Sequence, residues 1–122
     1  MTGSEVAPLL ITLGALFAVG LAAADSHIVR AEVATHAELA AYRAAGATAV
    51  VAGRFIDARG EPLTGPLDGR VIGIAPDDLR RIPRRLVVSA GPDRVPALAA
   101  ALGGGFASHL ITDAASGGLL LA

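Results

Sequence analysis

Short apolar runs that alternate with helix-forming segments are the feature that most constrains the fold of this chain. Continuous apolar runs of this length are typical of strands buried on both faces of a parallel sheet. Alternation of such strands with helices indicates an α/β fold. The expected strands cover residues 15–21, 48–52, 71–74, 86–89 and 109–111.

Helix signals fall between these runs. Thr35 and Glu38 have the spacing of a capping box, and Gly46 is placed to end the helix that follows it. Pro76 opens a second helix, which we expect to end at Ile82. Two more helices are expected to begin at Pro92 or Asp93 and at Thr112 or Asp113, and the stretch 57–69 is expected to be a turn and a loop. These elements predict a single domain with a three-layer, Rossmann-like parallel sheet.

Composition excludes several kinds of chemistry. The chain has no cysteine, which excludes disulfides, thiol catalysis and cysteine-bound zinc. Its formal net charge of −1 does not provide the excess of positive charge that binding to nucleic-acid phosphates requires. Lysine is absent too, so every residue in the Lys+Arg count of 10 is arginine, a side chain whose guanidinium matches phosphate oxygens well. We therefore expect no direct nucleic-acid contact by this chain.

The amino-terminal region has two interpretations. Residues 6–24 carry no charge, and this length is compatible with a membrane span or the core of a signal peptide. However, the residues before this run include Glu5 and no basic residue, and a proline and two glycines divide the run into short pieces. We therefore expect a buried strand over 15–21, a cytoplasmic protein and no membrane contact, with the membrane interpretation as the alternative.

Polar and glycine residues follow three of the expected strands. In an open α/β sheet, ligands bind outside the carboxyl ends of the strands, and parallel strands place these ends at one edge. Helix N-termini and arginine side chains at such an edge favour an anionic ligand. The sequence therefore predicts that the ligand-binding residues are Gly53, Arg54, Gly91, Arg94, Thr112 and Asp113.

Each of these residues also has a purely structural interpretation. Arg54 can pair with Asp57 or lie on the surface, and Asp113 can serve only as a helix N-cap. Gly91 can simply allow a tight turn. Arg94 is the strongest candidate, because a cation in the first turn of a helix opposes the helix dipole unless an anion is bound nearby.

The sequence gives little support for an enzyme. The histidines, His27, His36 and His109, do not have the spacing of metal ligands, and no serine lies in a nucleophile elbow. Neither a phosphate-binding P-loop nor a dinucleotide-binding glycine motif is present. The arginines in 80–85 follow two aspartates and are expected to form a solvated face. We expect no catalytic residue, metal or cofactor.

Four motifs, in the same order and spacing, resemble the SorC/DeoR-type family of bacterial transcriptional regulators. They correspond to the end of the family's sugar-binding (effector) domain. The motifs are GRFID at 53–57, RVIGI at 70–74 with DLRRIP at 78–83, VSAGPDR at 88–94, and LITD at 110–113.

This resemblance implies a fold of the NagB/RpiA/CoA-transferase-like type, truncated at its N-terminus. It implies that residues 1–122 are part of a sugar-binding domain without a helix-turn-helix domain, and that the partners are a phosphorylated sugar and further copies of the chain. A ligand-site lysine of the family falls on Arg94, whereas the family's Gly-Asp pair falls on Ala49 and Val50. The alternative is a degenerate structural or oligomerisation fragment that does not bind a ligand.

Overall fold

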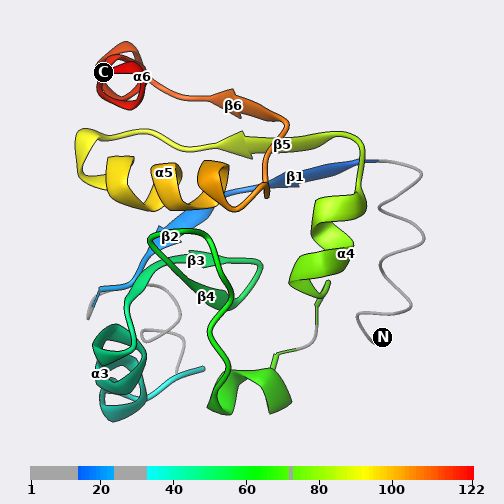
Figure 1. The fold of residues 1–122 in the computed structure, drawn as a ribbon, viewed down its shortest axis with the longest axis vertical. Coiled ribbons are helices and arrows are strands. Elements are labelled where there is room, and N and C mark those ends of the chain that lie inside the picture. The colour runs from blue at the N-terminus through cyan, green and yellow to red at the C-terminus, as the bar shows by residue number, and fades with distance from the viewer. Residues whose placement is uncertain (1–13, 24–32, 72) are drawn as a thin grey trace.

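Three strands form a parallel sheet in the upper part of Figure 1. The computed structural model describes residues 14–23, 33–71 and 73–122. The strands are β1 (Ala15–Phe17), β5 (Arg85–Val88) and β6 (His109–Ile111), in the order β1-β5-β6. Leu16 lies beside Leu86, which lies beside His109, so these three residues form a row across the sheet. The predicted α/β fold is confirmed, and the expected strands 86–89 and 109–111 are present to within one residue.

A second sheet is antiparallel and lies below the first in Figure 1. It contains β2 (Val19–Leu21), β3 (Ala47–Val51) and β4 (Arg54–Asp57), in that order. The expected strand 15–21 is therefore two strands, which join different sheets on either side of Ala18. The expected strand 71–74 is not formed by Val71, Gly73 or Ile74, and Ile72 lies outside the described residues.

The expectation that strand 48–52 joins the parallel sheet is wrong. Val51 pairs with Arg54, so only two residues connect β3 to β4. Ala52 has φ 50° and Gly53 has φ 79°, the pair of positive φ values that a tight hairpin turn requires. Asn or Gly usually occupies the first of these positions, and Ala52 gives no such signal. The sequence pattern therefore did not predict the hairpin turn at 52–53 or the strand β4 that follows it.

The helices agree better with the sequence. α3 (His36–Ala44) has the predicted capping box, in which the Glu38 N–H donates to Thr35 Oγ1 and the Thr35 N–H donates to Glu38 Oε1, each at 3.1 Å. α4 (Pro76–Arg81) and α6 (Ala114–Leu121) begin as expected. The third expected helix is a short 3₁₀ turn, η2 (Pro92–Arg94), followed by α5 (Val95–Gly103). The expected loop also contains a 3₁₀ turn, η1 (Pro66–Gly69).

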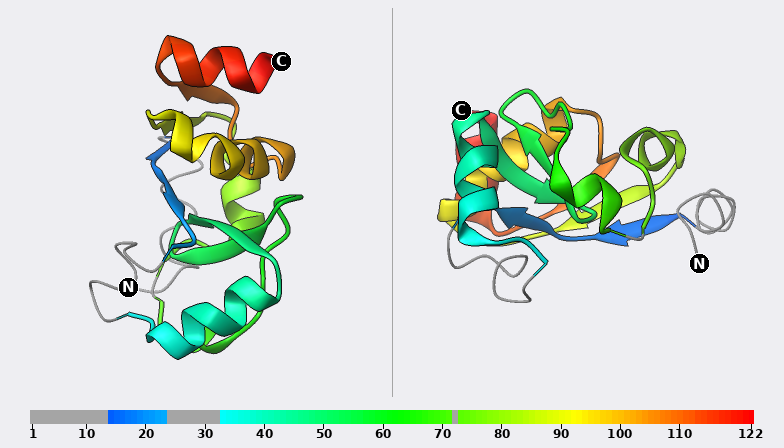
Figure 2. Two further views of the ribbon diagram at one scale, coloured as in Figure 1. Left: turned by 90° about the vertical axis from the view of Figure 1, so that its left-hand side faces the viewer. Right: turned by 90° about the horizontal axis from the view of Figure 1, so that it is seen from below.

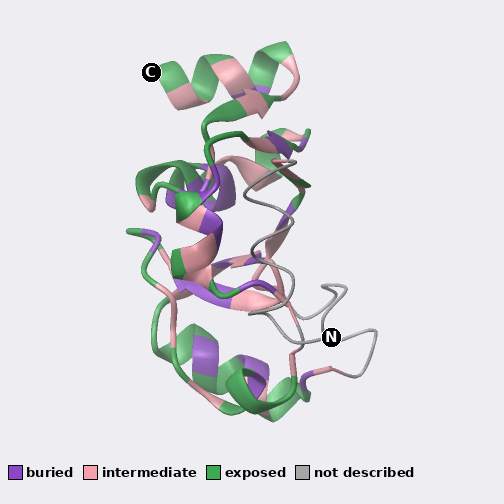
Figure 3. Ribbon diagram, turned by 90° about the vertical axis from the view of Figure 1, so that its right-hand side faces the viewer, coloured by how far each residue is buried: buried purple, intermediate pink, exposed green. Residues whose placement is uncertain are grey.

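Helix α5 lies between the two sheets and forms the centre of the main core (Figures 1 and 2). Ala97, Leu98 and Ala100 of α5 are fully buried, against Val87 of the parallel sheet and Ile56 of the antiparallel sheet. The scarcity of aromatic residues suits this arrangement, because small aliphatic side chains let a helix approach a sheet closely. Figure 3 shows buried segments along this interface and mostly exposed segments on α6.

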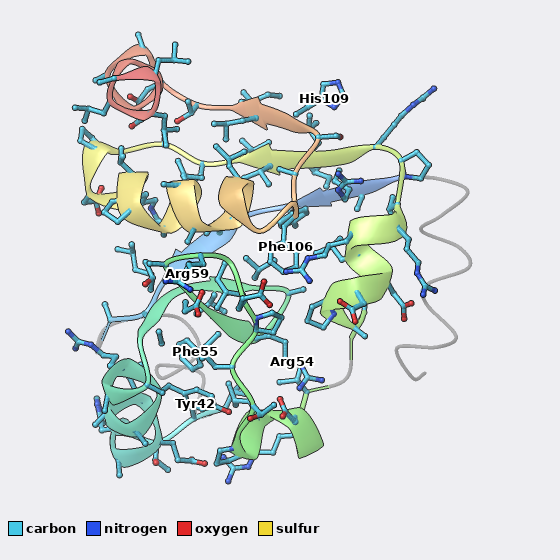
Figure 4. All side chains as sticks on the ribbon, viewed as in Figure 1. Tyr42, Arg54, Phe55, Arg59, Phe106 and His109 are labelled. Carbon is cyan, nitrogen blue, oxygen red and sulfur yellow. The ribbon has the colours of Figure 1, made fainter. Side chains whose placement is uncertain are left out.

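A smaller core joins α3 to the antiparallel sheet and η1. The rings of Tyr42 and Phe55 pack with their centroids 4.6 Å apart, as Figure 4 shows. The Leu67 N–H donates to the Tyr42 hydroxyl at 3.1 Å, and both residues are buried. In the part of the chain that the structure describes, no helix has the length and apolar character needed to cross a membrane.

Candidate functional site

The candidate site lies at the carboxyl edge of the parallel sheet. Because the three strands are parallel, the segments that leave β1, β5 and β6 emerge at the same edge. Gly91 and Arg94 follow β5, and Thr112 and Asp113 follow β6. The structure therefore brings together four of the six predicted ligand-binding residues.

The carboxylate of Asp113 holds this edge together. Its Oδ1 accepts from the Ser116 N–H at 2.7 Å, which makes Asp113 the N-cap of α6. Its Oδ2 accepts from the Gly91 N–H at 2.7 Å and from the Ser116 hydroxyl at 3.0 Å. The Ser116 N–H is the main group that lowers the pKa of Asp113, and the Gly91 N–H is the next. Asp113 is therefore a charged anchor that fixes the turn after β5 to the start of α6.

Gly91 requires a conformation that side-chain-bearing residues rarely adopt. Its φ is 108°, and a Cβ atom at this position would meet the Asp93 carboxylate at 2.6 Å. The turn after β5 therefore depends on glycine. This backbone leaves the Gly91 carbonyl to accept from the Arg94 N–H at 3.0 Å, which starts η2.

Arg94 links this edge to the antiparallel sheet. Its guanidinium Nη1 donates to the Val19 carbonyl at 3.1 Å. Val19 begins β2, directly after the chain leaves the parallel sheet. Arg94 also occupies the N-cap position of α5, where its positive charge lies against the positive end of the helix dipole. No acidic side chain among the described residues forms a salt bridge with it.

Thr112 carries a hydroxyl that no described residue satisfies. Its Oγ1 is buried and has no hydrogen-bond partner among the described residues. A buried hydroxyl without a partner costs about 1–3 kcal/mol. This hydroxyl, in the residue before Asp113, is the feature of the edge that most directly indicates a binding role.

Gly53 and Arg54 lie elsewhere. Both are in the β3–β4 hairpin of the antiparallel sheet, so the predicted convergence of three strand ends is wrong for these two residues. Arg54 Nη1 pairs with Asp68 Oδ1 of η1 at 2.5 Å, and Figure 4 shows its side chain on the η1 side of the hairpin. The alternative partner, Asp57, instead accepts from the backbone N–H groups of Arg59 and Glu61.

Sequence reasoning missed two contributors to the edge. Ser116 is fully buried and donates to Asp113, and the spacing of Asp113 and Ser116 was a usable N-cap signal. The Val19 carbonyl had no such signal, because its contact with Arg94 spans 75 residues of sequence.

Two of the arginines in 80–85, Arg80 and Arg81, have structural partners among the described residues. Arg80 donates to the Gly60 and Gly104 carbonyls and lies over the Phe106 ring, 4.4 Å from its centroid. Arg81 pairs with Asp78 at 3.7 Å. Within the described ranges, no group of histidine and carboxylate side chains is arranged to hold a metal ion.

Comparison with known proteins identifies the class. Residues 14–122 match the family described as "Putative sugar-binding domain". This match covers most of the chain, and the chain therefore belongs to that sugar-binding domain family. The resemblance to SorC/DeoR-type transcriptional regulators is confirmed.

Individual relatives agree with this assignment. The transcriptional regulator YjhU of Escherichia coli K12 is 36% identical over 108 residues, which make up 88% of this chain and 33% of YjhU. The full-length sorbitol operon regulator SorC of Klebsiella pneumoniae superposes with a TM-score of 0.83 at 20% identity, over 98% of this chain and 38% of SorC. A sugar-binding domain of a Vibrio fischeri transcriptional repressor gives a TM-score of 0.84 at 24% identity, over 97% of this chain and 48% of that one. The two structural matches show the fold, and this chain spans less than half of each relative.

Proposed function

We propose that this chain binds a phosphorylated sugar as the effector of a SorC/DeoR-type transcriptional regulator. The proposal is supported by the family and by the chemistry of the carboxyl edge. The observation that carries it is the buried hydroxyl of Thr112, the residue before Asp113, which has no partner among the described residues. A sugar hydroxyl can pair with the Thr112 hydroxyl, because both groups donate and accept. Since this oxygen is buried in the structure, the pairing requires the Thr112 side chain to rotate about χ1 toward the edge.

The residues of the edge have different roles in this proposal. Arg94 contacts the phosphate, since its guanidinium provides several donors and makes only one hydrogen bond among the described residues, to the Val19 carbonyl. Gly91 lets the backbone approach the ligand, and Thr112 binds a sugar oxygen. Asp113 accepts from a sugar hydroxyl while it keeps its bonds to the backbone.

Gly53 and Arg54 have a secondary place in the proposal. Arg54 is committed to Asp68, so it contacts an anionic ligand only after it exchanges this partner. Gly53 forms the turn next to it. We therefore assign them to the periphery of the site.

Several wider proposals follow from the family. We propose that the chain acts by binding and performs no catalysis, that it makes no direct contact with nucleic acid, and that it works in the cytoplasm as part of a homo-oligomer. The alternative is a degenerate structural or oligomerisation fragment that binds no ligand.

A thermal-shift screen tests the proposal. The purified chain is heated with a panel of sugar phosphates, with the matching unphosphorylated sugars and with inorganic phosphate. A ligand at 100 times its Kd stabilises the folded state by about 2.7 kcal/mol, which raises the melting temperature measurably. We expect a rise with one sugar phosphate that is lost in Arg94→Ala and kept in Arg43→Ala, a change at an exposed residue of α3. A cooperative melt that no sugar phosphate shifts would favour the fragment interpretation.

A further inference from the structure

Two side chains join the strand ends at the carboxyl edge of the parallel sheet. The Asp113 carboxylate accepts from the Gly91 N–H at 2.7 Å and so joins the segments that follow β5 and β6. The Arg94 guanidinium donates to the Val19 carbonyl at 3.1 Å and so joins the segments that follow β5 and β1. Of these two contacts, only that of Arg94 reaches a strand of the antiparallel sheet.

The segment that follows β1 connects the two sheets directly. Ala18 alone separates β1 of the parallel sheet from β2 of the antiparallel sheet, and Figure 1 shows this blue band passing from the upper sheet to the lower one. Val19 is the first residue of β2 and is 1% exposed. We call Ala18 and Val19 the sheet junction. The carbonyl that Arg94 contacts therefore belongs to the point where one sheet passes into the other.

The backbone of Arg94 is fixed from two sides. Its N–H donates to the Gly91 carbonyl at 3.0 Å, within the turn after β5. It also occupies the N-cap position of α5, whose buried residues Ala97 and Leu98 belong to the core that α5 forms with both sheets. The guanidinium therefore extends from a fixed backbone to the sheet junction, and its hydrogen bond ties the start of α5 to the start of β2.

The Arg94 guanidinium has donors for two partners at once. Nη1 donates to the Val19 carbonyl, whereas Nε and Nη2 have no hydrogen-bond partner among the described residues. Nε and Nη2 form a separate edge of the planar group, and a phosphate or carboxylate can bind such an edge with two parallel hydrogen bonds. An anion bound in this way leaves the hydrogen bond to the Val19 carbonyl in place.

We propose that Arg94 transmits the binding of an anion at the carboxyl edge to the sheet junction. The anion is the phosphate of the proposed effector, so the proposal rests on the proposed function. A long arginine side chain loses rotamer freedom when either partner fixes it. Once the anion has fixed the guanidinium, the hydrogen bond to the Val19 carbonyl forms without that entropy cost. Because such coupling is reciprocal, a stable junction also raises the affinity for the anion.

The charge of Arg94 strengthens this coupling. Without an anion, its positive charge opposes the dipole of α5, and no acidic side chain among the described residues forms a salt bridge with it. A bound anion offsets this repulsion and holds the guanidinium beside the Val19 carbonyl. Binding at the edge is therefore expected to stabilise the pairing of β2 with β3, which begins at Val19 and Val51.

Hydrogen exchange followed by NMR tests the coupling in the full chain, because local opening of each element is measured separately. The amides of 19–21 and 49–51, which pair between β2 and β3, report on the junction. Those of α3 serve as the internal reference, because α3 packs in the smaller core, away from α5. Wild type, Arg94→Ala and Arg94→Lys are each measured with inorganic phosphate and with sodium chloride at the same ionic strength.

The expected changes are confined to the junction amides. In chloride, Arg94→Ala should exchange about tenfold faster at 19–21 and 49–51, because a hydrogen bond from a charged group is lost, and α3 should be unchanged. Phosphate should slow these amides about threefold in the wild type, a share of the rotamer entropy of one arginine. Arg94→Lys should bind phosphate without slowing them, because one ammonium group does not offer two separate donor edges.

Three results would overturn the coupling. Equal acceleration of the α3 and junction amides in Arg94→Ala would show only a loss of global stability. Phosphate that shifts the Gly91 and Arg94 amide signals of the wild type but leaves exchange at 19–21 unchanged would show binding without transmission, and the proposed function would stand. This comparison needs no variant to fold. If neither phosphate nor any sugar phosphate shifts those signals, the proposed function fails and the coupling fails with it.

Discussion

Replacing Thr112 by valine should stabilise the chain, although it removes a polar group from the candidate site. Valine keeps the branched shape of threonine and puts a methyl group in place of the buried hydroxyl. That hydroxyl has no hydrogen-bond partner among the described residues. The Thr112 Cγ2 methyl faces Gly117 of α6, where a Cβ atom would lie 3.7 Å away, so the rest of the side chain has room to stay in place.

The size of the effect follows from the state of the hydroxyl. An unsatisfied buried hydroxyl costs about 1–3 kcal/mol, and Thr112→Val removes this cost without opening a cavity. We take the lower end, about 1 kcal/mol, because the substitution leaves neighbouring polar groups next to a methyl group. For a chain of this length, such a gain raises the melting temperature by about 3–5 °C.

Urea and thermal unfolding of the wild type, Thr112→Val and Thr112→Ser measure this change. Serine keeps the hydroxyl and serves as the matched control. We also expect Thr112→Val to lose the melting-temperature rise with a sugar phosphate, whereas Thr112→Ser keeps part of it. If Thr112→Val instead lowers the free energy of unfolding by about 1 kcal/mol, the hydroxyl has a partner in the protein, and the argument that it is available to a ligand fails.

Two further changes test the smaller core and the start of α3. Tyr42→Phe leaves the buried Leu67 N–H without its acceptor, so we expect a loss of about 1–2 kcal/mol in the free energy of unfolding, measured by urea titration. The Glu38 pKa is lowered to about 2, mainly by its hydrogen bond to Arg70 and then by the Thr35 N–H. A lowered carboxyl pKa contributes stability above its ordinary value of 4.5 that is lost as the pH falls toward 2. Unfolding titrations across this range should therefore show a steeper loss for the wild type than for Glu38→Gln.

The parts of the fold that local signals specify were predictable from the sequence. The capping box at Thr35, the proline that opens α4 and the Asp113 N-cap all act through residues three or four positions away. Strand pairing does not work in this way. The order β1-β5-β6 and the separate sheet β2-β3-β4 depend on contacts between distant segments. The split of 15–21 at Ala18 was hidden for the same reason, since both halves are equally apolar.

The candidate site shows the same division between local and distant interactions. Gly91, Thr112 and Asp113 could be placed together because each lies shortly after a strand that the apolar pattern identified, and parallel strands end at one edge. Arg54 has the same local signature, a charged residue after an apolar strand, yet it pairs with Asp68, fourteen residues further along in a turn that had no signal of its own. A strand end predicts a site only when the strand is parallel to its neighbours. Apolar composition does not distinguish such a strand from one arm of a hairpin, and here the difference was decided by the positive φ of Ala52.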